Sequence, residues 1–339
     1  MPIVTPANNY ILGVHKQTNE ATVGTVADYG FPVYGGRPTP VYDVGDINVT
    51  DAASIAGDTF KKPSSWALDS ATTPGFDDGL GTLLQALWPT DTPSGAAPSR
   101  VHAFSGLGGT QSWISMYGRW PGAGTKYHTF GKGLMTGLTF ESTQDGGPLI
   151  VGMSAIGEAV TDESSTVTVT ETTTSGYFAL QAASSYIRGI PNVPNASPAT
   201  PLTNVQDVKI ELVRNASAEP TVDSATVSNI AQGKLSFNVS MTWLWADWTV
   251  FNMNYFGASG GTTLSGTQVT GALELFWKHS VSATSTFKLY IPAMVFAAEM
   301  PEPNPDGSPL RMAVTGRVQK PSSGDHIVAT LVNNVTPAY

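Results

Sequence analysis

The chain has 339 residues, and only 13% of them are charged, whereas an ordinary soluble domain has about 25%. The formal net charge is −9, with nine basic and 16 acidic side chains up to residue 190 and eight and ten after it. Lys and Arg do not cluster, which argues against a protein that grips nucleic acid. Cysteine is absent, which excludes disulfides and thiolate chemistry. The low charge predicts a surface covered by neutral polar side chains or by other copies of the chain.

The first half opens without a targeting signal that we can identify. Its first 30 residues lack the basic start and apolar core of a secretory signal, and no apolar run approaches the ~20 residues of a membrane span. A short helix is predicted where Phe76, Leu80 and Leu87 share one face, with Asp77 and Asp78 in its first turn. Apolar and polar alternation then predicts strands at 111–117, 135–142, 149–156, 166–170 and 177–182.

A proline-rich segment at residues 187–206 separates the two halves. Four prolines between residues 191 and 201 oppose regular structure and stiffen the chain. The segment is therefore predicted to be a linker between one domain at residues 1–186 and another at 207–339.

The second half shows the clearest strand pattern, because five apolar side chains alternate with polar ones over 235–243. Further strands are predicted at 207–213, 271–278, 287–298 and 326–332. Pro292 is expected to place a bulge or a sheet edge in its strand. A second short helix is predicted after Asp247, which can cap it, with Trp248, Phe251 and Tyr255 along one stripe.

One pattern occurs in both halves. An apolar strand, a polar loop, the sequence Asp-Gly-Gly/Ser-Pro-Leu and a second apolar strand occur from Phe130 and again from Phe287. Asp-Gly turns are common, but the shared Pro-Leu and the similar order of predicted elements favour an internal duplication. A doubled domain indicates an object in which two similar units occupy equivalent places, as in a ring.

Four passages carry a resemblance to a known family. They are YILGVHKQTNEATVGTVADYGFPVYGG at 10–36, GFDDGLGTLLQALWP at 75–89, GKGLMTGLTFESTQDGGPLIVGMSAIGEAV at 131–160, and the C-terminal hairpin FKLYIPAMVFAAEMPEPNPDGSPLRMAVTGRV at 287–318. Together they resemble the tail tube proteins of long-tailed bacteriophages, in a form with a duplicated domain.

The resemblance implies a mainly β fold with two tandem tail-tube-type β-sandwich domains, each with a short flanking helix. It also implies a structural virion protein that assembles into stacked, pseudo-hexameric rings of three chains. DNA would pass through the tube without specific binding, along an acidic or neutral lumen. The partners would be other copies of the chain and the tail proteins at the tube ends. The protein would be made in the host cytoplasm and not secreted.

The loops at 45–65 and 214–233 and the turns at 143–148 and 302–309 are the predicted contacts between rings or subunits, because long loops can reach a neighbouring ring as hairpins or as arms that order on assembly. Their charged candidates are Asp46, Asp51, Asp58, Lys61, Lys62, Asp145, Arg214, Glu219, Asp223 and Asp306.

Catalytic and metal-binding motifs were not found. The five histidines lack metal-ligand spacing, and Ser154 lacks the glycines of a nucleophile elbow, so no catalytic residue, metal or cofactor is expected. The tryptophans at 243, 245, 248 and 277 are interpreted as core or interface residues. Two alternatives to a tail tube stay open: another β-sandwich virion protein, such as a decoration protein or adhesin, and a carbohydrate-binding module that uses exposed aromatic rings.

Overall fold

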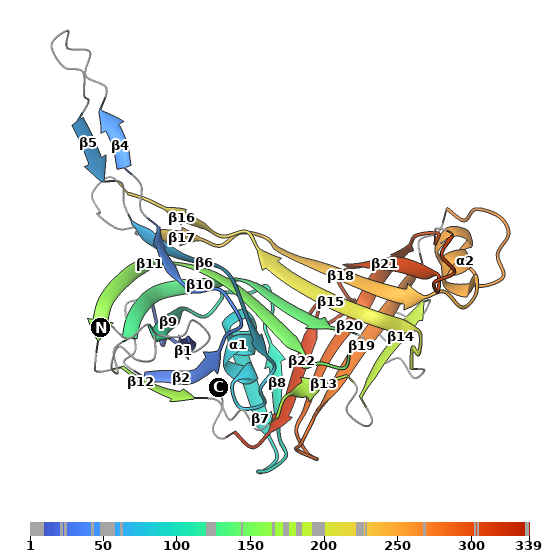
Figure 1. Ribbon diagram of the computed structural model, residues 1–339, viewed down its shortest axis with the longest axis horizontal. Coiled ribbons are helices and arrows are strands. Elements are labelled where there is room, and N and C mark those ends of the chain that lie inside the picture. Colours follow the sequence, from blue (N-terminus) through green and yellow to red (C-terminus); the bar gives the residue numbers. More distant parts are fainter. Residues whose placement is uncertain are drawn as a thin grey trace, which may run out of the picture.

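The computed structural model describes the chain except residues 1–9, 21–22, 24–25, 42–43, 48–57, 62–63, 120–126, 144, 165–166, 172–175, 181–184, 192–200, 222–226, 228, 267–268, 302, 304 and 336–338. Within the described residues it contains 22 strands and two short helices. The predicted mainly β fold is therefore confirmed at this level. Figure 1 shows a curved sheet around α1 (Leu80–Leu87) and a second group of strands that ends at α2 (Thr249–Phe256).

The sheet of the first half is built from eight strands, each hydrogen-bonded to the next strand in the sheet. Their order is β12 (Thr168–Glu171), β2 (Val26–Pro32), β1 (Ile11–Lys16), β9 (Ile114–Arg119), β10 (Tyr127–Ser142), β11 (Ile150–Ser164), β6 (Ser65–Pro74) and β3 (Thr39–Val41). All pairs are antiparallel except β12 with β2. Because α1 lies against β1, β8 and β10, its leucines are buried by the curved sheet.

The strands of the second half continue directly from β10. The series runs from β10 to β15 (Val205–Arg214), β18 (Leu235–Leu244), β21 (Arg311–Val318) and β20 (Thr286–Ala298). On the other side of β20 lies β19 (Thr270–His279), which pairs with β13 (Phe178–Ala179) and β14 (Tyr186–Pro191). A branch from β20 leads through β22 (Val328–Asn333) to β8 (Arg100–Ser105) and β7 (Thr90–Ser94).

Two long strands, β10 and β20, exchange one neighbour halfway along their length. β10 pairs with β9 up to Gly133 and with β15 from Gly137, while it pairs with β11 on its other side throughout. β20 pairs with β22 up to Tyr290 and with β21 from Met294, and its continuous partner is β19. The register with the continuous partner shifts at the same place in each strand, which is the geometry of a β-bulge. The bulge expected at Pro292 is therefore confirmed.

Buried apolar side chains from the two halves form one continuous core. It contains Trp66 and Leu138 from the first half together with Trp277 and Phe287 from the second. The Trp277 indole Nε1–H donates to Ser142 Oγ at 2.9 Å, so a polar contact also joins β19 to the end of β10. The division of the chain into two domains at 187–206 stays a prediction.

Two hairpins leave these sheets. β4 (Val44–Ile47) and β5 (Asp58–Lys61) pair with each other and project from the body in Figure 1. β16 (Ser217–Glu219) and β17 (Asn229–Ala231) form a second hairpin that lies along β11. Backbone N–H of Val227 donates to Ser64 O at 3.0 Å, so this loop of the second half is tied to the first.

The structure corrects several details of the predicted elements. The first helix begins at Leu80, so Asp77 and Asp78 precede it and do not occupy its first turn. The Asp77 carboxylate instead accepts a hydrogen bond from the Ser285 hydroxyl at 3.0 Å. The prolines were expected to exclude regular structure from their segment, but β14 extends to Pro191. Pro191 is compatible with this strand because it lies at the last position of β14, and the other edge of β14 makes only a single bridge, from Arg188 to Pro201, among the described residues.

Candidate assembly surfaces

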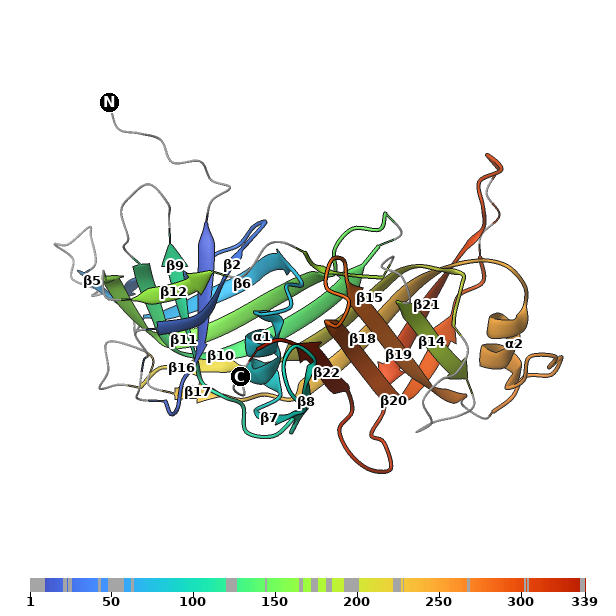
Figure 2. The ribbon, with the colours of Figure 1, turned by 90° about the horizontal axis from the view of Figure 1, so that it is seen from below.

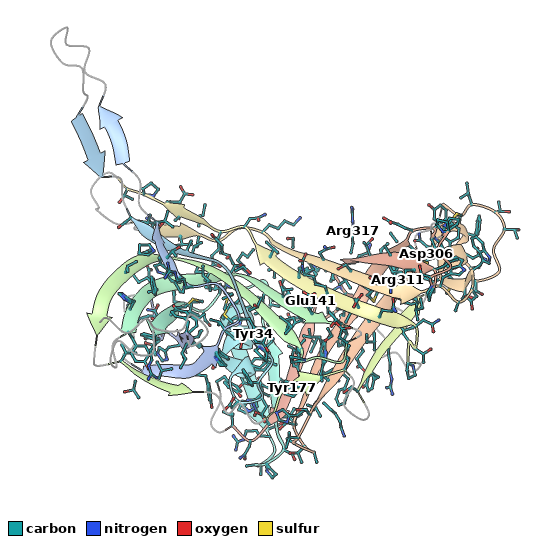
Figure 3. The ribbon with its side chains drawn as sticks, in the orientation of Figure 1. Tyr34, Glu141, Tyr177, Asp306, Arg311 and Arg317 are labelled. Atoms are coloured by element: carbon teal, nitrogen blue, oxygen red, sulfur yellow. The ribbon has the colours of Figure 1, made fainter. Side chains whose placement is uncertain are left out.

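A polar sheet face extends across both halves of the chain, and it is formed by the paired segments of β10, β15, β18 and β21. One cross-strand row is formed by Thr139, Glu211, Asn238 and Arg317, and the next row by Glu141, Lys209, Ser240 and Thr315. The residues between them, such as Phe140, Ile210 and Val239, are buried on the opposite face. Strict alternation thus gives the sheet one apolar face and one solvated face. Figure 3 labels Glu141, Arg311 and Arg317 on these strands.

The charges on this polar sheet face are balanced. Acidic side chains at 141, 207 and 211 alternate with basic ones at 209, 311 and 317. Lys209 Nζ lies 2.5 Å from Glu211 Oε1. This hydrogen bond raises the pKa of Lys209 and lowers the pKa of Glu211, so both stay charged near neutral pH. The acid excess of the first half is therefore not concentrated on this surface.

The projecting hairpin carries three of the predicted contact residues. Asp46 lies in β4 opposite Thr59, and Asp58 and Lys61 lie in β5. The fold therefore brings these three together on one hairpin. Asp51 and Lys62 lie outside the described residues.

The two Asp-Gly turns place Asp145 and Asp306 at exposed positions. The following glycines, Gly146 and Gly307, have φ of 73° and 77°, a backbone conformation that favours glycine. The Asp306 carboxylate accepts a hydrogen bond from Ser308 N–H at 2.9 Å, which lowers the pKa of Asp306. The repeated motif thus forms the same glycine conformation twice.

The loop at 214–233 carries three of the predicted contact residues: Arg214, Glu219 and Asp223. Glu219 is exposed in β16 and accepts a hydrogen bond from Ser217 Oγ at 2.6 Å. Arg214 is only 5% exposed, and its Nη1 donates to Gln232 Oε1 at 3.0 Å. The guanidinium therefore anchors the base of the hairpin, while the contact of Arg214 with another ring or subunit stays a prediction. Asp223 lies outside the described residues.

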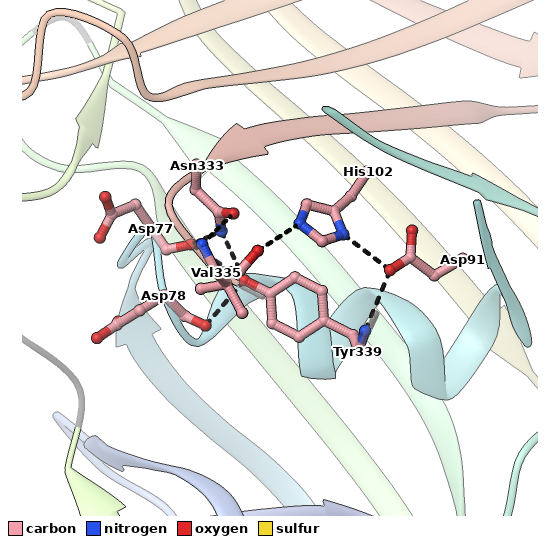
Figure 4. A network of polar contacts seen from close by, with 7 residues as sticks. All are labelled: Asp77, Asp78, Asp91, His102, Asn333, Val335 and Tyr339. Atoms are coloured by element: carbon pink, nitrogen blue, oxygen red, sulfur yellow. Dashed lines mark hydrogen bonds and ion pairs between the residues drawn. The ribbon is translucent and has the colours of Figure 1, made fainter. Parts of the chain in front are cut away.

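A buried polar cluster escaped the sequence analysis (Figure 4). The His102 imidazole is fully buried, with Nδ1 2.8 Å from Asp91 Oδ2 and Nε2 3.3 Å from the Val335 carbonyl. Tyr339 N–H also donates to Asp91 Oδ2 at 3.1 Å, and the Tyr339 hydroxyl donates to the Asp78 carbonyl at 3.0 Å. Burial raises the pKa of Tyr339 well above its usual value. The cluster ties Asn333, Val335 and Tyr339 to the residues around α1, with His102 buried among them.

The tryptophans divide into buried and exposed groups. Trp243 and Trp277 are buried, as their strand patterns predicted. Trp248 is 52% exposed beside α2, where it contacts Trp245 and Phe251 edge to face. A core role for Trp248 is therefore wrong, while an interface role stays a prediction.

No family model matches the chain, and no curated protein sequence is significantly similar to it. In the described part of the chain, His, Asp and Glu side chains do not gather in groups of three that could hold a metal ion. None of the helices described there has both the length and the apolar character needed to cross a membrane.

Proposed function

We propose that the protein is a structural subunit of a virion tail tube, in which copies of the chain close into rings and the rings stack. The observation that carries this proposal is the polar sheet face that continues from β10 to β21 across the two halves. A wall of neutral side chains and balanced charges offers DNA phosphates neither a basic patch nor a strong repulsion, so DNA can slide past it.

Ring closure is supported by the strands at the ends of the sheet. Within the described residues, β3, β7 and β12 each pair with one strand only. Unpaired strand edges favour pairing with another chain, and closure into a ring satisfies their backbone groups. Two similar halves per chain would give a ring of three chains with pseudo-sixfold symmetry, in which each half is a tail-tube-type sandwich.

Stacking of the rings is assigned to the hairpin of β4 and β5. It projects from the body and carries Asp46, Asp58 and Lys61 on two short paired strands. Ring-to-ring contact through such a hairpin would leave the polar sheet face unobstructed.

A deletion tests this division of roles. Residues 44–61 are replaced by a short Gly-Ser linker, and wild type and variant are examined by sedimentation and negative-stain electron microscopy at increasing concentration. We expect wild type to form tubes and the variant to stop at single rings. Monomers of wild type under every condition would contradict the proposal.

The exposed rings of Trp248 and Tyr255 favour a second candidate, a carbohydrate-binding module, because aromatic faces stack on sugars. Quenching of tryptophan fluorescence by an oligosaccharide, with no assembly at any concentration, would support this alternative against the tube.

A further inference from the structure

The end of the molecule around α2 contains a run of four aromatic rings, of which Phe251 is buried, and we call this run the aromatic cap: Trp245, Trp248, Phe251 and Tyr255. Successive ring centroids lie 4.9, 5.6 and 4.4 Å apart. Trp248 is 52% exposed and Tyr255 45% exposed, and Leu264 in the loop after α2 is 74% exposed. Between residues 245 and 269 the only charged residue is Asp247. Exposed aromatic residues with few charges nearby are typical of the centre of a protein interface.

A proline-rich arm projects at the same end of the molecule. It comprises the described residues between 299 and 310, and Figure 2 shows it as the orange-red segment that rises beyond β20 and β21. Its two sides enclose a hollow of about 340 Å³ lined by Met300, Pro301, Pro309, Leu310 and Arg311, among others. Met300 is 57% exposed at this hollow. The arm therefore combines the side chains of Met300 and two prolines with a guanidinium, in a hollow whose lining is mostly polar.

The aromatic cap and the arm are held together in one chain, but the cap does not fill the hollow. Trp245 N–H donates to Leu310 O at 2.9 Å, which fixes the base of the arm beside the cap. Trp248 is not part of the hollow's lining and remains half exposed. Both surfaces are therefore available to a second molecule.

We propose that the aromatic cap of one copy docks on the arm of a second copy, with the Trp248 ring entering the hollow between Met300 and Arg311. Prolines bind well against aromatic rings because they lose little conformational entropy. A guanidinium close to an indole face adds a cation–π attraction. This inference rests on the proposed function in one respect only: the two copies in contact are taken to be subunits of a tube.

Charge complementarity favours a second copy as the occupant. The arm carries Glu299 and Asp306 at exposed positions, and Arg311 is exposed at the start of β21, where it pairs with Leu244 beside the cap. In the described part of the chain, the Arg311 guanidinium has no side-chain hydrogen bond and no ion pair. An incoming arm can therefore place its carboxylates against Arg311 of the chain whose cap it covers.

The first test is sedimentation of the full chain as Trp248→Ala, with Tyr34→Ala as the matched control. Tyr34 is 68% exposed in the first half of the molecule and is predicted to be uninvolved. Loss of an aromatic anchor should weaken self-association at least about tenfold, and the control should leave it unchanged. Equal association of the two variants would overturn the inference.

A charge exchange keeps the test independent of folding effects at Trp248. One variant carries Arg311→Glu, and the other carries Glu299→Lys and Asp306→Lys. Each variant alone should lose the association, and the mixture should recover it. Mixing without recovery would overturn the inference.

Cross-linking separates this contact from tube formation. Because the chain lacks cysteine, Leu264→Cys and Met300→Cys copies can be mixed and joined with a short bismaleimide, and Val281→Cys, which changes another exposed side chain, replaces Met300→Cys in the control. A mixed dimer above the control supports the contact even if tubes never form. Tubes without this dimer would leave the proposed function standing and overturn the contact. Oligosaccharide binding at Trp248 by a strictly monomeric chain would also overturn it.

Discussion

The two hairpins with the Asp-Gly turn resemble each other in sequence but differ in how their strands pair. β10 and β11 are hydrogen-bonded over nearly their whole length, from Tyr127 to Glu141. β20 and β21 pair only between Met294 and Ala298, because the first half of β20 is taken by β22. Both first strands nevertheless contain a bulge where one neighbour replaces another. The bulge, rather than the hairpin, is the feature that the halves share, and it allows a strand to serve two groups of strands.

The pairing of these strands across the two halves determines how cooperatively the molecule unfolds. The second half of β10 is the bridge to β15, with six paired residues, so the two halves should unfold together. β20 pairs with β19 and β22, which in turn pair with β13, β14 and β8 of the first half, so the halves are also linked there. Damage at the bulge of β10 should therefore affect the whole molecule.

The largest effect is expected for Leu138→Ala, which removes a fully buried side chain next to the β10 bulge. The lost contacts and the remaining cavity should lower the free energy of unfolding by about 2–5 kcal/mol. Urea unfolding followed by circular dichroism should show one transition, shifted as a whole. Val213→Ala, which changes a side chain 43% exposed on the neighbouring strand, is the control. Two separate transitions would contradict a shared core.

The next effect is expected for Ser142→Ala, which leaves the buried Trp277 indole N–H without its acceptor. An unsatisfied buried donor costs about 1–3 kcal/mol. Ser240→Ala on the polar sheet face should change the free energy of unfolding by less than about 0.5 kcal/mol. Equal losses in the two variants would show that the indole contact does not join the halves.

Pro292→Ala tests what holds the bulge of β20 in place. If the exchange of β22 for β21 fixes the bulge, the proline is only a compatible residue, and the change in stability should stay within about 1 kcal/mol. Thermal unfolding of the variant measures this change. A loss several times larger would mean that the proline itself creates the bulge.

The smallest effect concerns pH and the buried carboxylate Glu158 on β11. Burial raises the pKa of Glu158 above its ordinary value, although Lys132 Nζ lies 3.6 Å away. The folded state then holds this proton more tightly than the unfolded state, so the carboxyl's contribution is favourable at low pH and is lost as pH rises from the ordinary pKa through the raised one. Relative to Glu158→Gln, wild type should therefore lose stability across that window.

Urea midpoints between pH 3 and 8 measure this dependence, with Glu219→Gln as the exposed control. A stability difference that grows in favour of wild type as pH rises would mean that the Lys132 ion pair outweighs burial.

Much of the strand pattern was predictable, because alternation reports which face of a strand is buried. The strands at 207–213 and 235–243 were expected from this signal and correspond to β15 and β18. The joining of β10 to β15 was not predicted, since it depends on pairing between residues about 70 positions apart. The buried role of Arg214 was also missed, because a side chain that anchors a hairpin has the same sequence signature as an exposed one. The burial of His102 beside Asp91 was missed as well, because the pair follows no motif.

The central claim is that two similar halves of the chain close around an empty bore with other copies. End-on electron-microscope images of assembled particles, averaged without imposed symmetry, test it most directly. We expect threefold particles with six similar lobes around a central hole. Compact monomers under every condition, or assemblies without a hole, would contradict the claim.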